Sequence, residues 1–120
     1  MSHIVAIQTR VHDPEGVAAA CRRLNLPAPR QGKADLFSGE VSDLIVQLPA
    51  WQYPVVIDTP SGQVQFDNFE GAWGEQKELD RFLQSYAVEK AKIEARRKGY
   101  VVSEQALLDG SIKLQIVEGA

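Results

Sequence analysis

Cysteine and histidine are scarce in this sequence, which has one cysteine and two histidines in 120 residues. A single thiol cannot form a disulfide within the chain. A structural zinc site needs four nitrogen or sulfur ligands, usually in close pairs, and the three donors here stand apart. We therefore predict no metal site. The three donors are His3, His12 and Cys21.

Motifs for nucleotide binding and nucleophilic catalysis are also missing. No glycine-rich segment is followed by the lysine and serine or threonine of a phosphate loop. Neither serine–glycine pair, at positions 38 and 61, has the context of a nucleophile elbow. Cys21 falls on the apolar stripe of a predicted helix, where a free cysteine packs as a small hydrophobic side chain. We predict no catalytic residue and no cofactor.

Long hydrophobic runs are absent as well. No run of about 18 apolar residues occurs, so we expect no membrane-spanning helix. The first seven residues lack the basic lead and apolar run of a signal peptide. We expect a small soluble domain of the cytoplasm, or of the plastid stroma if the source bears plastids.

Charge and length describe an ordinary globular chain. Thirteen basic and 16 acidic residues give a formal net charge of −3 and a pI near 5.3. Such a balance disfavours general nucleic-acid binding, which requires a basic face. The 120 residues suit one domain, and we assign 1–120 to a single domain.

The first half of the chain predicts one helix among short strands. Residues 3–11 are apolar and β-branched and predict a strand. Asp13 and Pro14 are an N-cap and a first helical residue, so a helix should run from there to about residue 24. Residues 27–33 predict a loop, and 44–48 predict a strand that begins as early as 41. Residues 55–57 and 64–66 predict a hairpin around the turn at 59–62.

The second half predicts a long helix and a second hairpin. Apolar residues recur at helical spacing over residues 75–98, and Gly99 is the expected C-cap. Beyond a strand that opens at residue 100, Asp109-Gly110 predicts a type I′ turn. The order is β-α-β-ββ-α-ββ. This order predicts an α+β fold, with an antiparallel-dominated sheet of five or six strands and two helices on one face. The helical stripe is Leu79, Phe82, Leu83, Tyr86, Ala87 and Ile93.

Aromatic residues in loops are the first candidate binding feature. Large rings are enriched at interfaces, and binding residues favour loops held on rigid scaffolds. The alternative is that these rings fold back over the end of the core. The predicted protein-interaction residues are Trp51, Tyr53, Phe69 and Trp73.

A basic segment near the end of the long helix is the second candidate. It could contact a polyanion, although interleaved Glu89 and Glu94 dilute its charge. The alternative is helix capping together with solvation. The alternative nucleic-acid residues are Lys90, Lys92, Arg96, Arg97 and Lys98.

A third hypothesis is a small enzyme or ligand carrier that uses Asp67, Glu70 and Trp73 around a pocket. A concave site beside a carboxyl group with a shifted pKa would favour it. Solvated loop acids are the competing interpretation.

Four segments together resemble a known family. They are Met1-Ser2-His3-Ile4 with Ile7 and Thr9, Phe82-Leu83-Gln84-Ser85-Tyr86-Ala87, Lys98-Gly99-Tyr100, and Asp109-Gly110-Ser111-Ile112-Lys113-Leu114. The sequence resembles the hypothetical chloroplast reading frame thirty-five family of plastids, cyanobacteria and other bacteria, whose members have about this length. The resemblance implies no activity, cofactor or catalytic residue. It implies an accessory role beside an AAA-type ATPase.

Our leading hypothesis is therefore a non-catalytic accessory or protein-interaction module rather than an enzyme. The absence of a catalytic set and the loop aromatics support it. Partner identity, ligand and oligomeric state stay open at this point.

Overall fold

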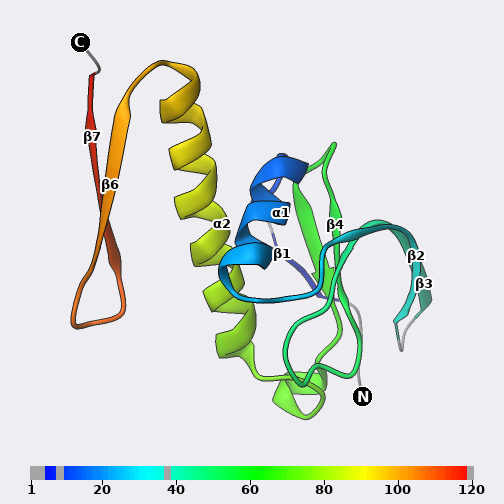
Figure 1. Cartoon of the computed structure of the whole chain (residues 1–120). Helices are drawn as coiled ribbons and strands as arrows, with labels where there is room; N and C mark the ends of the chain where they lie inside the picture. The colour runs from blue at the N-terminus through cyan, green and yellow to red at the C-terminus, as the bar shows by residue number, and fades with distance from the viewer. Residues whose placement is uncertain (1–4, 8–9, 37–38, 119–120) are drawn as a thin grey trace.

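The computed structural model describes residues 5–7, 10–36 and 39–118. Within these residues the chain forms two α-helices, a short 3-10 turn (η1) and seven strands (Figure 1). Their bounds are β1 Val5–Ile7, α1 Pro14–Arg23, β2 Arg30–Leu36, β3 Gly39–Val46, β4 Val55–Asp58, β5 Gln63–Phe66, η1 Phe69–Gly71, α2 Gln76–Arg97, β6 Val101–Ala106 and β7 Ile112–Val117.

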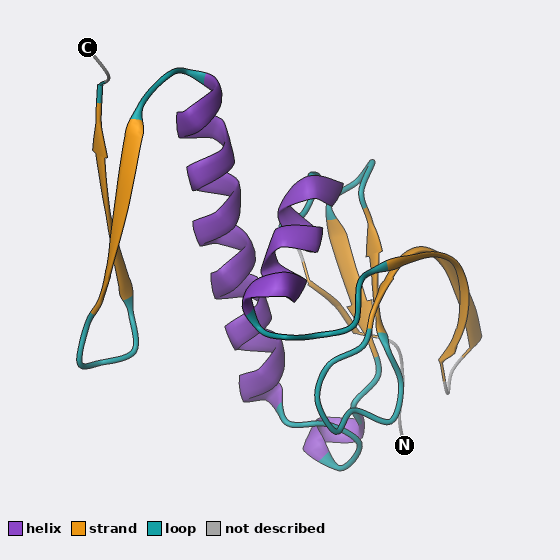
Figure 2. Cartoon of the chain, in the orientation of Figure 1, coloured by secondary structure: helices purple, strands orange, loops and turns teal. Residues whose placement is uncertain are grey.

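Strands β1 to β5 form one antiparallel sheet in the order β1-β5-β4-β3-β2. Its register places Ile57 opposite Leu44 on one side and opposite Val64 on the other. Both helices lie on one face of this sheet, as Figure 2 shows. The predicted α+β class, with an antiparallel sheet, is confirmed.

The core lies between this sheet and the two helices. Phe82 and Leu79 of α2 are fully buried, and Val17 and Cys21 of α1 pack into the same cluster. Burying such a side chain contributes roughly 1.5–3 kcal/mol. Sheet residues complete the cluster because alternate side chains point toward the helices. They are Leu44, Val46, Val55, Ile57, Val64 and Phe66.

Both predicted helices are present with nearly the predicted bounds. Asp13 caps α1 by accepting a hydrogen bond from the Glu15 amide, and Pro14 is the first helical residue. The Asp13 amide in turn donates to the Tyr86 hydroxyl at 3.1 Å, which ties the start of α1 to the middle of α2. Leu83 is partly buried, whereas Ala87 is exposed. The apolar stripe of α2 is thus narrower than predicted.

The region between the first helix and the middle hairpin differs from the prediction. A strand, β2, begins at Arg30, inside the segment predicted as a loop, and β3 begins at Gly39 rather than at residue 41 or 44. Hydrophobic patterning does not detect β2, because its sequence is mostly polar. It forms a strand by pairing with β3 at the edge of the sheet. The strand predicted over 3–11 is shorter in the structure, where β1 ends at Ile7 and residues 10 and 11 are not in a strand. Residues 3, 4, 8 and 9 lie outside the described residues.

The last two strands form a sheet of their own, which we call the C-terminal hairpin (residues 101–117). It stands on the far side of α2 from the main sheet (Figure 1). The predicted type I′ turn is wrong: Gly110 has φ +90°, but Asp109 is not in the left-handed region. The Gly110 amide donates to Leu107 O and the Leu107 amide to Ser111 O. These bonds define a type I turn followed by a left-handed glycine, the usual three-residue hairpin loop.

Candidate functional site

An aromatic cluster lies where the loop before β4 meets the loop before α2. We use the term aromatic cluster for Tyr53, Phe69 and Trp73. The Phe69 and Trp73 rings are stacked, with centroids 4.8 Å apart and planes 25° apart. Tyr53 meets Trp73 edge to face at 5.5 Å between centroids. The tertiary structure therefore brings together three of the four aromatic residues singled out in the sequence.

The backbone beneath the cluster is strained. Phe69, Glu70 and Gly71 have consecutive φ angles of +48°, +52° and +100°. A residue with a side chain in this left-handed region costs of order 1–3 kcal/mol and persists where the surrounding structure enforces it. Such strain concentrates at functional sites, and Phe69 is 39% exposed here.

Hydrogen bonds hold this strained loop in place. The Trp73 amide donates to Asn68 O at 2.9 Å, and the Asn68 side-chain amide donates to Gly74 O at 3.2 Å. The Gln52 amide donates to Trp73 O at 2.8 Å, which joins the two loops. These hydrogen bonds therefore fix the loop that carries Phe69 and Trp73.

A shallow hollow of about 480 Å³ opens beside the cluster. Its walls come from the same two loops, so it is continuous with the Trp73 ring. The lining residues are Ala50, Trp51, Gln52, Gly71, Ala72, Trp73, Gly74 and Glu75.

Trp51, predicted as an interaction residue, is buried in the structure. Only 4% of it is exposed, and its ring packs edge to face on Phe66. Its indole Nε1 donates to Glu75 O at 3.1 Å, just before α2 begins. A Cβ on Gly74 would lie 2.4 Å from the Trp51 ring. Trp51 is thus a core residue that positions the loop before α2.

The two acids proposed for a pocket around Trp73 differ in their exposure to solvent. Asp67 is fully buried, whereas Glu70 is exposed on the strained loop.

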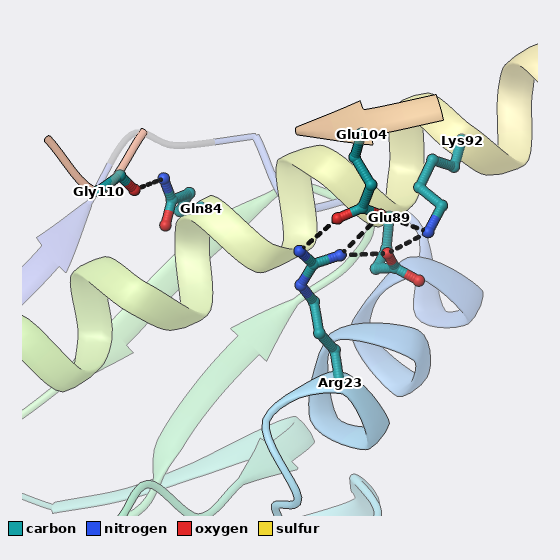
Figure 3. Close-up of polar contacts among 6 residues, drawn as sticks. All are labelled: Arg23, Gln84, Glu89, Lys92, Glu104 and Gly110. Atoms are coloured by element: carbon teal, nitrogen blue, oxygen red, sulfur yellow. Dashed lines mark hydrogen bonds and ion pairs between the residues drawn. The ribbon is translucent and has the colours of Figure 1, made fainter. Parts of the chain in front are cut away.

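Most of the basic segment on α2 is engaged in ion pairs. Lys92 Nζ lies 2.7 Å from Glu104 and 3.2 Å from Glu89. These two carboxylates also bond Arg23, at 2.6 and 3.1 Å respectively, in the network drawn in Figure 3. The Arg23 and Lys92 side chains hold the pKa of Glu104 down at about 2.

Of the other four cations in this segment, two form ion pairs. Lys90 lies 3.0 Å from Glu94, and Arg97 lies 2.7 Å from Glu15. Arg96 and Lys98 are exposed. With three of its five cations already bonded to carboxylates, the segment offers little positive charge to a phosphate backbone.

A second hollow, of about 270 Å³, lies beside the turn between β4 and β5. Its lining residues are Arg10, His12, Ser61, Gly62 and Gln63. His12 Nδ1 donates a hydrogen bond to Thr59 O at 2.9 Å, because a carbonyl oxygen only accepts. Gly62 has φ +79°, and a Cβ there would lie 2.8 Å from His12 Nε2. The turn is therefore built to hold the imidazole against its backbone.

Two carboxyl groups, those of Asp43 and Asp58, meet at the end of β4. Burial raises the pKa of Asp43, and the hydrogen bond and charge of Asp58 raise it further. Ser61 donates its hydroxyl to Asp58 Oδ2 at 2.8 Å. Asp43 has a positive φ of +132°, which is unusual for a residue with a side chain. Sequence reasoning missed this pair, because two acids on different strands, 15 positions apart, give no local signal.

The described residues contain no group of three or more metal-ligating side chains, and none of their helices is long and apolar enough to cross a membrane. Burial raises the pKa of the Cys21 thiol to about 11. A thiol with so high a pKa is a poor nucleophile at neutral pH, which agrees with a packing role. His3 lies outside the described residues.

Comparison with known proteins leaves the assignment to the geometry, since no family model, no curated protein and no solved structure matches this chain. The resemblance to the hypothetical chloroplast reading frame thirty-five family stays a prediction.

Proposed function

We propose that this chain is a non-catalytic accessory module that binds another protein through the aromatic cluster. The observation that carries the proposal is the stacked Phe69 and Trp73 pair on a strained, hydrogen-bonded loop. Rigid aromatic side chains supply much contact area at low entropic cost, and they dominate binding energy where they fill a partner's pocket.

The neighbouring hollow supports a protein partner rather than an enclosed small molecule. It is shallow and open, and it is walled partly by backbone at Gly71, Ala72 and Gly74. A side chain or a short peptide segment fits such a surface, whereas small-molecule sites bury most of their ligand. The resemblance described above supports an AAA-type ATPase as the partner.

The test uses the whole chain as bait in an extract of its native cell, with bound proteins identified by mass spectrometry. Phe69→Ala should weaken capture of the specific partner, by about 2 kcal/mol or roughly 30-fold in Kd once that partner is purified. Its denaturation midpoint should stay close to the wild-type value, because Phe69 is 39% exposed.

Two further variants separate binding from folding. Trp51→Ala removes a buried ring and should lower stability. Leu108→Ala changes an exposed apolar residue far along the chain and should alter neither property. Unchanged capture by Phe69→Ala and by Trp73→Ala would exclude the aromatic cluster as the partner surface.

A second candidate, a small-ligand site, is favoured by one specific observation. Arg10 and His12 together line the hollow of about 270 Å³ beside the turn between β4 and β5. The two basic side chains suit a small anion. Titration with inorganic phosphate should then shift the His12 imidazole resonances in the NMR spectrum, and Arg10→Gln should abolish the shift. Unmoved resonances at millimolar phosphate would exclude a phosphate site.

A further inference from the structure

The C-terminal hairpin lacks a core of its own. None of its residues from Val101 to Val117 is buried. A two-stranded ribbon is marginally stable in water unless something covers one of its faces. Among the described residues, the network at Glu104 joins it to α2 and to Arg23 of α1, and the Gln84 side chain of α2 donates to Gly110 O (Figure 3). The exposed large apolar residues of this segment are Val101, Leu107, Leu108, Ile116 and Val117.

The whole molecule exposes more surface than a compact monomer of its mass. Its accessible surface is 7227 Å², whereas a folded monomer of 13.3 kDa is expected to expose about 6,450 Å². The excess is close to the roughly 800 Å² that each partner buries in a stable interface of standard size. The radius of gyration, 15.3 Å, also exceeds the value of about 13.6 Å expected for 120 residues.

The free edge of β7 is suited to strand pairing. The Leu107 amide bonds Ser111 O, and hydrogen-bonded pairs alternate along an antiparallel ladder. The backbone groups of Ile112, Leu114 and Ile116 therefore point away from β6, at the open edge. Natural edge strands are protected by charges, prolines or bulges, yet β7 carries Lys113 as its single charge.

We propose that two copies of this chain pair antiparallel through β7, which joins their C-terminal hairpins into a four-stranded sheet. Leu114 lies opposite Leu114 of the second copy, and Ile112 lies opposite Ile116. In this register the outward backbone groups of both edges bond each other. The apolar rows that face α2 join into one row, and the two α2 helices cover one face.

The two registers shifted by one residue pair less favourable side chains across the interface. Moving the centre to Lys113 places two lysines directly opposite each other, and moving it to Gln115 sets Ile112 against Glu118. A second copy is favoured over an unrelated strand because the excess surface matches the area of one standard interface, and because β7 complements itself in this register.

The register also sets Lys113 directly opposite Gln115 of the second copy, in a non-hydrogen-bonded pair where side chains are closest. This placement gives a test with two opposite substitutions at one residue. Gln115→Glu creates two ion pairs across the interface, and Gln115→Lys creates two like-charge pairs. Cross-strand charge pairs of this kind should shift the dimer Kd by about 3- to 30-fold, downward for the glutamate and upward for the lysine.

Sedimentation equilibrium of the full chain, from about 1 to 100 μM, measures these constants. The matched controls are Ser103→Glu and Ser103→Lys, because Ser103 pairs with Gln115 inside the hairpin but lies one strand away from the interface. These controls should leave the dimer Kd unchanged.

Two results would overturn the proposal. One is a wild-type chain that stays monomeric up to about 100 μM. The other is a dimer that responds equally to both charges at Gln115.

Discussion

The main sheet and the C-terminal hairpin consist of similar strands that are held in place by different forces. In the main sheet Val55, Ile57 and Val64 are fully buried beneath the helices, and hydrophobic burial fixes their positions. In the hairpin the equivalent apolar residues are partly or largely exposed, and Glu104 supplies the tether through two cations. Both sheets have antiparallel hydrogen-bond ladders, so the ladder does not explain why one sheet is held by a core and the other by ion pairs. The helices bury one face of the main sheet, whereas both faces of the hairpin stay at least partly exposed.

Because a hydrophobic core holds the main sheet and ion pairs hold the hairpin, the stabilities of the two regions should respond differently to mutation and to pH. A change in the core should act on the whole molecule, because its members contact both helices and the sheet. A change in the hairpin should act locally, since that segment opens without exposing the core. The following predictions test this division, from the largest expected effect to the smallest.

Phe82→Ala should have the largest effect. Phe82 is fully buried between α2 and the main sheet, and removing its ring leaves a cavity. We expect a loss of about 3–5 kcal/mol in the free energy of unfolding, measured with denaturant. A loss below about 1 kcal/mol would contradict the core described here.

Gly74→Ala should come next. The new Cβ would lie 2.4 Å from the buried Trp51 ring, so the ring or the loop before α2 must move. Overpacking of this kind costs about 1–3 kcal/mol. Gly110→Ala in the hairpin is the matched comparison, because a Cβ there meets nothing within 4 Å and only its φ of +90° opposes the change. The hairpin variant should unfold at nearly the wild-type denaturant concentration.

Glu104→Gln should loosen the hairpin while leaving the core intact. Arg23 and Lys92 lower the pKa of Glu104 from 4.5 to about 2, so the charged carboxylate favours the docked hairpin. This contribution is complete above about pH 4.5 and is lost as the pH falls toward 2. Because the groups are partly exposed, we expect about 1 kcal/mol or less.

Hydrogen exchange distinguishes a local effect from a global one. Amides of β6 and β7 should exchange faster in Glu104→Gln, and in the wild type on acidification, while amides of β4 and β5 stay protected. Equal acceleration in both sheets would contradict the separation of the two regions.

Leu108→Ser should have the smallest effect. Leu108 lies at the tip of the hairpin and is fully exposed, so the substitution removes no buried surface. The free energy of unfolding should change by less than about 0.5 kcal/mol. A larger loss would mean that the tip is covered in solution, and its dependence on protein concentration would then identify a self-contact.

The elements that the sequence predicted well are those with strong local signals. The helix after Asp13 and Pro14 and the long helix that ends before Gly99 match the structure within a residue or two. Strand β2 was missed because its pairing comes from β3 and not from its own polar residues. The loop aromatics were recognised as a group, but Trp51 and Phe69 look alike in sequence, and only packing separates the buried ring from the exposed one.

By itself the sequence determined the class of fold and both helices, because capping and helical spacing act within a few residues. Three features were decided only in the tertiary structure. They are the separation of the last hairpin from the main sheet, the pairing of Asp43 with Asp58, and the stacking of Phe69 on Trp73. Each depends on segments far apart along the chain or on a backbone angle that no local pattern specifies. Such contacts arise from how whole elements share one core, and a hydrophobic pattern marks a strand without saying which sheet it joins.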